Sequence, residues 1–251
     1  MNTRDVIQDI VKHTAGPAGF TAVKLTSSDT ETTLDAMNAD RTVILKGKLH
    51  NAAPEFQGEI GMGNLGFLAG VSGLGAYSTQ SENATVTVVT RDRNGVETPD
   101  HLLFKDGDGN KDQYRFMSKE IIDQTLKTVT FKGVEWDIAF EPTKAKVAEL
   151  QQVASIYGDI EPNFTVKTED GNLVVTVGAA DGSYTGKRIF ATNVNGTLSQ
   201  GYAWPLSQVL AILKLGMSSS CVMQISARGA LQISVDSGIA KYDYILPALT
   251  V

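Results

Sequence analysis

The chain has 251 residues, with 22 Lys and Arg against 28 Asp and Glu, which gives a formal net charge of −6. Its single cysteine, Cys221, excludes an intramolecular disulfide framework and a cysteine-only metal site. No apolar stretch approaches the roughly 18 residues that a membrane span requires, and Met1–Asp5 lacks the apolar core of a signal peptide. We therefore expect a soluble, cytoplasmic, globular protein with no membrane partner.

Helical and strand periodicities follow one another in a fixed order along the first half of the chain. Thr3–His13 predicts an amphipathic helix that ends before Gly16-Pro17, and residues 21–37 predict two strands around a turn near Ser28-Asp29. The next predicted elements are a short apolar helix near residues 63–74, a strand at Thr85–Val89, a turn at Asn94-Gly95 and a strand through Leu102–Phe104.

The second half repeats this order of elements. Pro142 and Thr143 open a predicted helix, and Pro205 lies in the first turn of another, where its missing N–H costs nothing. Asp170-Gly171 is a strong hairpin signal. The predicted strands of this half are Phe164–Thr168, Leu173–Val177, Cys221–Ala227 and Ala230–Asp236, the last two joined by Arg228-Gly229.

The spacing of the helices indicates a duplication. They begin near residues 3, 63, 143 and 205. The starts of the second and third helices are therefore about 20 residues further apart than those of the other neighbouring helices, and the extra residues fall within Lys105–Thr130. The pattern predicts an α+β fold of two similar domains, each with two helices packed on antiparallel sheets. We place the N-terminal domain at 1–115, an interdomain connector at 116–130 and the C-terminal domain at 131–251.

Local motifs for catalysis and cofactor binding are weak. Gly61–Gly66 matches the dinucleotide fingerprint, but the helix that should follow is short and rich in glycine, so tight packing of a helix on a sheet is the better interpretation. Asp106–Asp112 has Lys111 and Met117 where a calcium loop needs Gly and Glu, which favours an acidic, solvated turn. Cys221 begins a predicted core strand, where a lone thiol usually serves packing.

No arrangement of nucleophile and base stands out. The chain has no Gly-x-Ser-x-Gly elbow and no carboxylate pair at a telling spacing. We interpret His13 and His101 as surface residues on polar faces or loops. The sequence therefore predicts a protein that is not an enzyme and has no catalytic residues, metal site or cofactor.

The charges of the four predicted helices differ in sign from the rest of the chain. The helices together carry a net charge of +2, so the remainder carries −8. A positive helical surface is what a face opposite phosphates needs, although an ordinary solvated face has the same charges. The basic residues of these helices are Arg4, Lys12, Lys144, Lys146 and Lys214.

The C-terminal run Ala230–Ala248 is similar to the closing strands and tail of the DNA polymerase sliding clamp family. That family includes proliferating cell nuclear antigen and the clamps of T-even-type phages. Asn64–Leu68 resembles the second-helix region of the phage clamps, and Lys146–Val177 resembles the third helix and its hairpin. The two-domain length is like that of the trimeric branch of the family.

The resemblance implies a processivity factor for DNA replication: a homotrimeric, head-to-tail ring that encircles double-stranded DNA without reading its sequence. It implies that Arg4, Lys12, Lys144, Lys146 and Lys214 face the DNA, and that DNA polymerase and a clamp loader are partners. If the origin is viral, as the phage-like features imply, the protein acts in the host cell cytoplasm.

The resemblance also places a peptide-binding groove under the connector and beside the C-terminal tail. The matching positions are Ile121, Ile122 and Leu126 in the connector and Tyr244, Leu246, Pro247 and Leu249 in the tail. Ordinary core packing is an equal alternative for each. An alternative for the whole protein is a β-rich structural virion or tail protein that assembles through its sheet edges.

Overall fold

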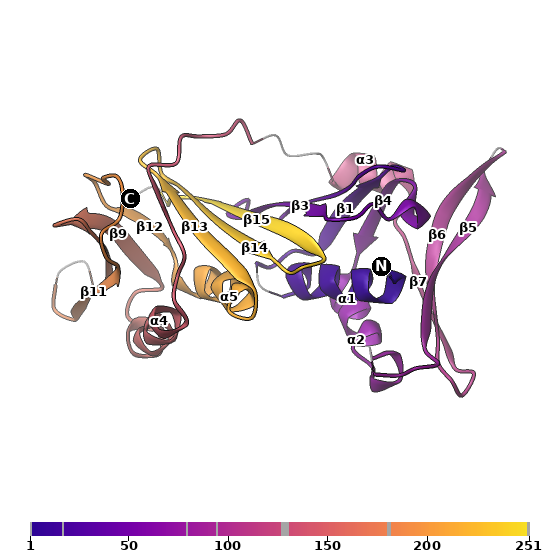
Figure 1. The fold of residues 1–251 in the computed structure, drawn as a ribbon. Helices are drawn as coiled ribbons and strands as arrows, with labels where there is room; N and C mark the ends of the chain where they lie inside the picture. Colours follow the sequence, from indigo (N-terminus) through magenta and orange to yellow (C-terminus); the bar gives the residue numbers. More distant parts are fainter. Residues whose placement is uncertain are drawn as a thin grey trace. The chain divides into compact units, whose positions relative to one another are not determined.

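The computed structural model describes residues 2–16, 18–78, 80–93, 95–126, 131–179 and 182–249. The chain divides into two compact units: unit 1 is Met1–Thr130 with Ser237–Tyr242, and unit 2 is Phe131–Asp236 with Asp243–Val251. Each unit combines antiparallel sheets with a pair of adjacent helices, which confirms the predicted α+β class (Figure 1). The predicted domain and connector boundaries stay predictions. None of the helices in the described ranges is both long and apolar enough to cross a bilayer.

Unit 1 contains two groups of antiparallel strands. Its helices are α1 (Thr3–Thr14), α2 (Leu65–Ser72) and α3 (Lys119–Thr125), with short 3-10 turns η1 (Pro54–Phe56) and η2 (Gly75–Tyr77). Its strands are β1 (Ala22–Ser27), β2 (Thr32–Met37), β3 (Ile44–Leu49), β4 (Gly58–Gly63), β5 (Thr85–Arg93), β6 (Val96–Lys105) and β7 (Lys111–Arg115). Neighbouring strands follow the orders β4-β1-β2-β3 and β5-β6-β7.

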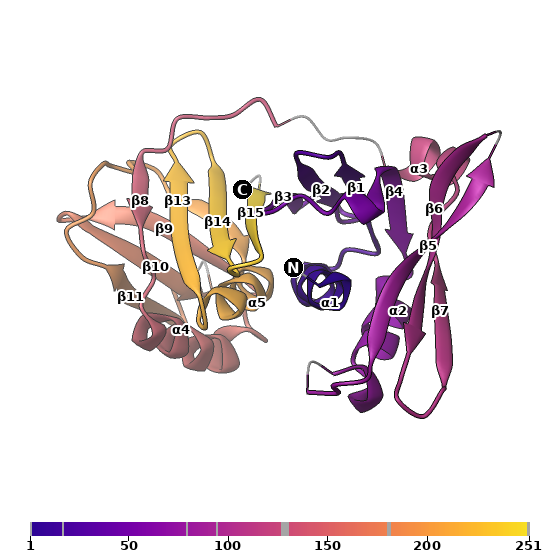
Figure 2. The same ribbon diagram turned by 45° about the vertical axis from the view of Figure 1, so that its right-hand side comes forward.

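Unit 2 repeats the arrangement of helices and strands. Its helices are α4 (Lys144–Tyr157) and α5 (Leu206–Gly216). Its strands are β8 (Ile138–Phe140), β9 (Asn163–Glu169), β10 (Asn172–Gly178), β11 (Thr185–Ala191), β12 (Tyr202–Pro205), β13 (Ser220–Ser226), β14 (Ala230–Asp236) and β15 (Ala240–Pro247), the start of which belongs to unit 1. The strand orders are β11-β10-β9-β12 and β15-β14-β13-β8. Figure 2 shows the two helices of each unit side by side, α1 with α2 and α4 with α5.

Local sequence signals account for the helix starts and the turns. The side chain of Asn2 caps α1 and that of Thr143 caps α4, each by accepting a backbone N–H of the first turn. Pro205 lies one residue earlier than predicted, at the end of β12, and α5 begins after it. Asp170 and Gly171 both have positive φ, at 49° and 75°, as the predicted hairpin turn requires. Asn94 of the other predicted turn lies outside the described residues.

The connector region holds a helix that the sequence pattern did not predict. Helix α3 packs on β4, where a Cβ on Gly61 would lie 2.9 Å from both the Ile122 side chain and the Met117 sulfur. Glycine is therefore needed in the Gly61–Gly66 motif for close packing, as predicted, but the segment that approaches is Met117–Ile122 and not the helix that follows the motif. Isolated helices this short are unstable, so α3 depends on this tertiary contact.

His13 is a correction to the sequence interpretation, because its side chain is buried and not on the surface. It is 1% exposed and stacks on the ring of Tyr242, with centroids 4.0 Å apart and planes 4° from parallel. The hydroxyls of Tyr242 and Ser237 both donate to Asp9 Oδ2 at 2.8 Å. Burial, and secondarily the charge of Lys12, lower the pKa of His13 to about 4. The ring is thus neutral in the folded protein at neutral pH.

A neutral, buried His13 predicts a pH-dependent stability. The unfolded chain takes up a proton near pH 6.5, while the folded protein takes it up only near pH 4, so acidification between these values favours unfolding. We expect the wild type to lose up to about 3 kcal/mol of unfolding free energy over this range. His13→Phe keeps an aromatic ring on Tyr242 but cannot titrate, so its urea-unfolding curves should lack this loss. Parallel pH dependences of the two proteins would contradict the assignment.

Candidate nucleic-acid interface

Three of the lysines predicted to face DNA are exposed on the helices. Lys12 lies in the last turn of α1, Lys144 in the first turn of α4 and Lys214 in the last turn of α5. In the part of the chain that the structure describes, none of the three forms an ion pair at 4 Å or less. Helix α2 has no ionisable residue. The helices therefore offer a small, unneutralised positive charge.

Lys146 is placed differently from these three. Its Nζ lies 2.8 Å from Glu149 Oε2 on the same helix, and the other oxygen of Glu149 lies 3.7 Å from Arg188 Nε on β11. Both side chains of the Lys146–Glu149 pair are a little more than one-third exposed. A neighbouring carboxylate cancels most of the field of this lysine, so its pull on a phosphate is weaker than that of Lys144.

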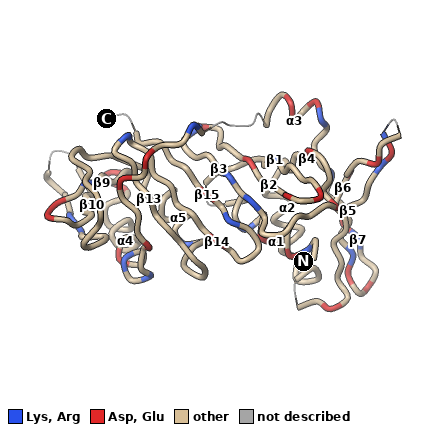
Figure 3. Tube along the Cα trace, turned by 45° about the horizontal axis from the view of Figure 1, so that its top comes forward, with Lys and Arg blue, Asp and Glu red and all other residues tan. Residues whose placement is uncertain are grey.

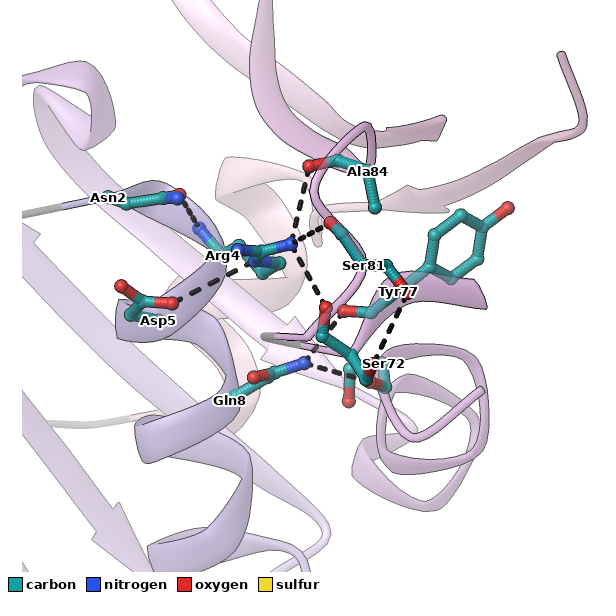
Figure 4. A network of polar contacts seen from close by, with 9 residues as sticks. Asn2, Arg4, Asp5, Gln8, Ser72, Tyr77, Ser81 and Ala84 are labelled. Carbon is teal, nitrogen blue, oxygen red and sulfur yellow. Dashed lines mark hydrogen bonds and ion pairs between the residues drawn. The ribbon is translucent and has the colours of Figure 1, made fainter. Parts of the chain in front are cut away.

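Arg4 is engaged inside unit 1. Its Nη1 donates to the carbonyl oxygens of Ser78 and Ser81 at 3.0 Å and of Ala84 at 3.3 Å (Figure 4). Its side chain is only 11% exposed. Gln8, one turn along α1, donates to two further carbonyls, those of Ser72 and Tyr77. These contacts fasten the segment after α2 to α1, so we leave Arg4 out of the proposed DNA-facing set.

The contacts of Arg4 predict a structural role that can be measured. Arg4→Gln removes a cationic donor from three carbonyls, so the unfolding free energy should fall by about 1–3 kcal/mol. Lys12→Gln, an exposed position on the same helix, should stay within about 0.5 kcal/mol of the wild type. Urea denaturation of both variants tests this, and equal midpoints for the two would rule the role out.

The predicted partner-binding residues separate into buried and accessible ones. Tyr244 and Leu246 have no exposed surface and Ile122 has 3%. Leu246 also accepts a hydrogen bond from Trp204 Nε1 at its carbonyl, at 3.1 Å. For these three residues the side chains serve core packing, which was the alternative interpretation. Ile121 is 44% exposed, Pro247 is exposed, and Leu126 and Leu249 are partly exposed.

Leu126 and Leu249 each line a cavity in their own unit. The cavity at Leu126 has a volume of about 250 Å³ and is also lined by Asp35, Ala36, Met37, Arg41, Gln124 and Thr125. The cavity at Leu249 has a volume of about 390 Å³ and lies against strands β9, β10 and β12. Sequence reasoning missed Met37 and Arg41, since nothing in the sequence places the end of β2 beside the connector.

The side chains of the described residues do not indicate a resident metal. Within the described ranges, no three His, Cys, Asp or Glu side chains form a group that could hold a metal ion. The Asp106 turn is closed by its own hydrogen bonds, because Oδ1 accepts from the backbone N–H groups of Asp108 and Asn110. This confirms the prediction of a solvated turn. Cys221 is buried, and burial raises the pKa of its thiol to about 11.

Two solved structures match almost the entire chain. The proliferating cell nuclear antigen (PCNA) of Thermococcus kodakaraensis has a TM-score of 0.70 at 8% identity, covering 99% of this chain and 98% of that one. The PCNA of A. fulgidus, solved with the C-terminal region of FEN-1 bound to it, has a TM-score of 0.67 at 12% identity, covering 99% and 95%. This chain has the PCNA clamp fold.

The fold match confirms the predicted two similar domains of helices on antiparallel sheets. No protein-family model and no curated protein sequence matches the chain. At 8–12% identity the likeness resides in the arrangement of elements and not in shared residues. The clamp fold therefore rests on the order and pairing of its helices and strands.

Proposed function

We propose that the protein is a non-enzymatic sliding clamp that encircles duplex DNA as a homotrimer and tethers DNA polymerase and other replication proteins. The observation that carries this proposal is the match to two PCNA structures over 99% of the chain. It includes both units, so it extends to the duplicated architecture from which clamps are built. The resemblance of the C-terminal run to the clamp family supports the same function from sequence.

The ring would close through strands whose outer edges have no partner among the described residues. Strand β7 ends the order β5-β6-β7 in unit 1, and β11 ends the order β11-β10-β9-β12 in unit 2. An unpaired strand edge is a template for another chain. Two different edges on one subunit give a head-to-tail interface, which makes a closed ring when the rotation per subunit divides a full turn. We assign the subunit contact to β7 of one copy and β11 of the next.

The exposed lysines would centre the duplex in the ring. With Lys12, Lys144 and Lys214 from each of three subunits, nine cations would face the DNA, and helix α2 would add no charge. Contacts to phosphates are blind to base sequence and weaken as salt rises. Few contacts suit a clamp, because a ring retains DNA by enclosing it and strong adhesion would slow its movement.

The cavity at Leu126 is the proposed dock for polymerase and clamp-loader peptides. The A. fulgidus PCNA is bound by the C-terminal region of FEN-1, so a clamp of this fold accepts a terminal region of a partner. The apolar side chains of Met37 and Leu126 line the cavity here, and Arg41 and Asp35 give it a polar rim. Such a site fits a peptide with an apolar anchor. Because parts of the sequence resemble phage clamps, we extend the proposal to a role in phage-type DNA replication.

Charge reversal on the helices tests the proposed function. The double variant Lys144→Glu/Lys214→Glu keeps Lys12 and replaces the other two exposed lysines by glutamate. The net charge of these three positions in each subunit changes from +3 to −1, so the helical surface that faces the DNA would repel phosphate. We expect clamp-dependent DNA synthesis to fall by about tenfold, and further as salt rises. Lys105→Glu, at an exposed position on β6, is the matched control and should leave synthesis unchanged.

Two checks keep the outcome interpretable. Light scattering of each variant should give the trimer mass of about 81 kDa, three times the chain's 26.9 kDa. Undiminished synthesis by the trimeric double variant would contradict the assignment of the lysines. Open-ended polymers in place of a closed trimer would favour a structural virion or tail protein.

A further inference from the structure

A buried carboxylate lies where strands β5 and β6 change register. Val89 pairs with His101 and Thr90 pairs with Pro99, so Asp100 is the extra residue of a β-bulge in β6. Its side chain is 3% exposed, and among the described residues its Oδ1 has no hydrogen-bond donor. A bulge redirects the side chain of its extra residue, and here the covered carboxylate of Asp100 lines a cavity.

Three arginines surround this carboxylate. Arg91 Nε and Arg93 Nη2 lie 3.9 and 3.5 Å from Asp100 Oδ1, and Arg115 Nη2 lies 3.5 Å from Oδ2. The hydrogen bond from His101 Nδ1 at 3.0 Å, helped by the arginine charges, holds the pKa of Asp100 below its usual value despite burial. The carboxylate is thus ionised at neutral pH, and one negative charge faces three guanidinium groups.

The arginines are only partly neutralised and remain accessible. Arg91, Arg93 and Arg115 are 58%, 48% and 67% exposed, so their outer donors face solvent. The hairpin also carries acidic residues (Figure 3), but Asp92 and its cross-strand neighbour Glu97 point to the opposite face of the sheet from Arg91 and Arg93. Arg93 also interacts electrostatically with the carboxylate of Glu120. Three arginines against Asp100 and Glu120 leave the face around Asp100 with a small net positive charge. We call Arg91, Arg93 and Arg115 around Asp100 the arginine cluster.

A cavity of about 320 Å³ adjoins the arginine cluster. Arg93 and Asp100 line one side, and the first half of β4 lines the other. Strand β4 ends its sheet order, and the carbonyl of Gly61 accepts the N–H of Met117 at 2.8 Å on its outer side. The backbone of Glu59, two residues earlier, also faces outward, and no strand in the described ranges pairs with it. The cations of the cavity lining are Arg93 and Lys119 and its carboxylates are Asp100 and Glu59, of which Glu59 lies 3.3 Å from Lys24 Nζ. The cavity thus combines a free strand edge with balanced charges, beside the exposed donors of the arginine cluster.

We propose that this cavity and the arginine cluster form a docking site for an extended, acidic peptide segment of a partner protein. The segment adds a strand to the outer edge of β4 at Glu59, and its carboxylates pair with Arg91 and Arg93. Asp100 positions the arginines and does not itself bind the peptide. A nucleic-acid backbone has phosphates but no N–H groups to pair with a strand edge, so the free edge favours a peptide.

Apart from Arg115, this site is separate from the proposed clamp surfaces. It lies within unit 1 and uses neither the helix lysines nor the cavity at Leu126. Arg115 belongs to β7, which the proposed ring would use, so a test should leave Arg115 unchanged. The proposal does not require DNA binding, and its test leaves the strand of the proposed ring contact unaltered.

The test uses the full-length protein and a fluorescein-labelled decapeptide of alternating Glu and Thr, which presents carboxylates on one side of an extended strand. Fluorescence anisotropy should show saturable binding, and Arg91→Gln/Arg93→Gln should weaken it at least tenfold. Lys105→Gln, an exposed cation elsewhere on β6, should bind as the wild type does. The same peptide with Gln in place of Glu should bind at least tenfold more weakly.

A second measurement does not depend on the folding of any variant. Hydrogen exchange of the wild type should slow at the backbone amide of Glu59 when the Glu-Thr peptide is added. Unchanged exchange there, equal affinity for the Gln-Thr peptide, or full binding by the double arginine variant would each overturn the proposal. Competition by an oligothymidylate that depends on Arg91 and Arg93, with no protection at Glu59, would show a nucleic-acid contact instead and would also overturn it.

Discussion

Open strand edges are the constraint on which the proposed assembly depends. A strand at the end of a sheet exposes backbone N–H and C=O groups that water must satisfy unless another strand pairs with them. Strands β7 and β11 end their sheet orders in different units of the chain, so each copy offers two unlike edges. When β7 of one copy pairs with β11 of the next, the backbone groups of both edges are satisfied and the copies are joined head to tail. A closed ring follows when three such steps return to the start.

Enclosure of the DNA, as proposed, would change what the rest of the molecule must do. A protein that holds DNA by adhesion needs many phosphate contacts, and its affinity then falls steeply with salt. This chain carries a net charge of −6, and its helices have three exposed lysines that form no ion pair within the described residues. Arg4 is used to fasten α1 to the segment after α2, and Lys146 is paired with Glu149. Such weak charge is adequate for centring a duplex inside a ring and inadequate for gripping one from outside.

The sequence predicted what local interactions determine and missed what distant contacts determine. The start of α1 and the Asp170-Gly171 turn follow from capping and backbone preferences within a few residues. His13 was misplaced because the ring that covers it, Tyr242, lies more than 200 positions away in the chain. The carbonyl partners of Arg4 and the cavity beside Leu126 were equally invisible. Periodicity identifies a polar face, but only the tertiary structure shows which polar groups form hydrogen bonds inside the protein.

The most direct measurement compares retention of the loaded protein on nicked circular DNA and on the same DNA after linearisation. If the closed ring holds the duplex, the protein should stay on the circle through washes at high salt and leave the linear molecule through its free ends. Blocking those ends with bound protein should restore retention. Equal retention on the circle and on linear DNA with open ends would contradict the account, because adhesion and not enclosure would then hold the DNA.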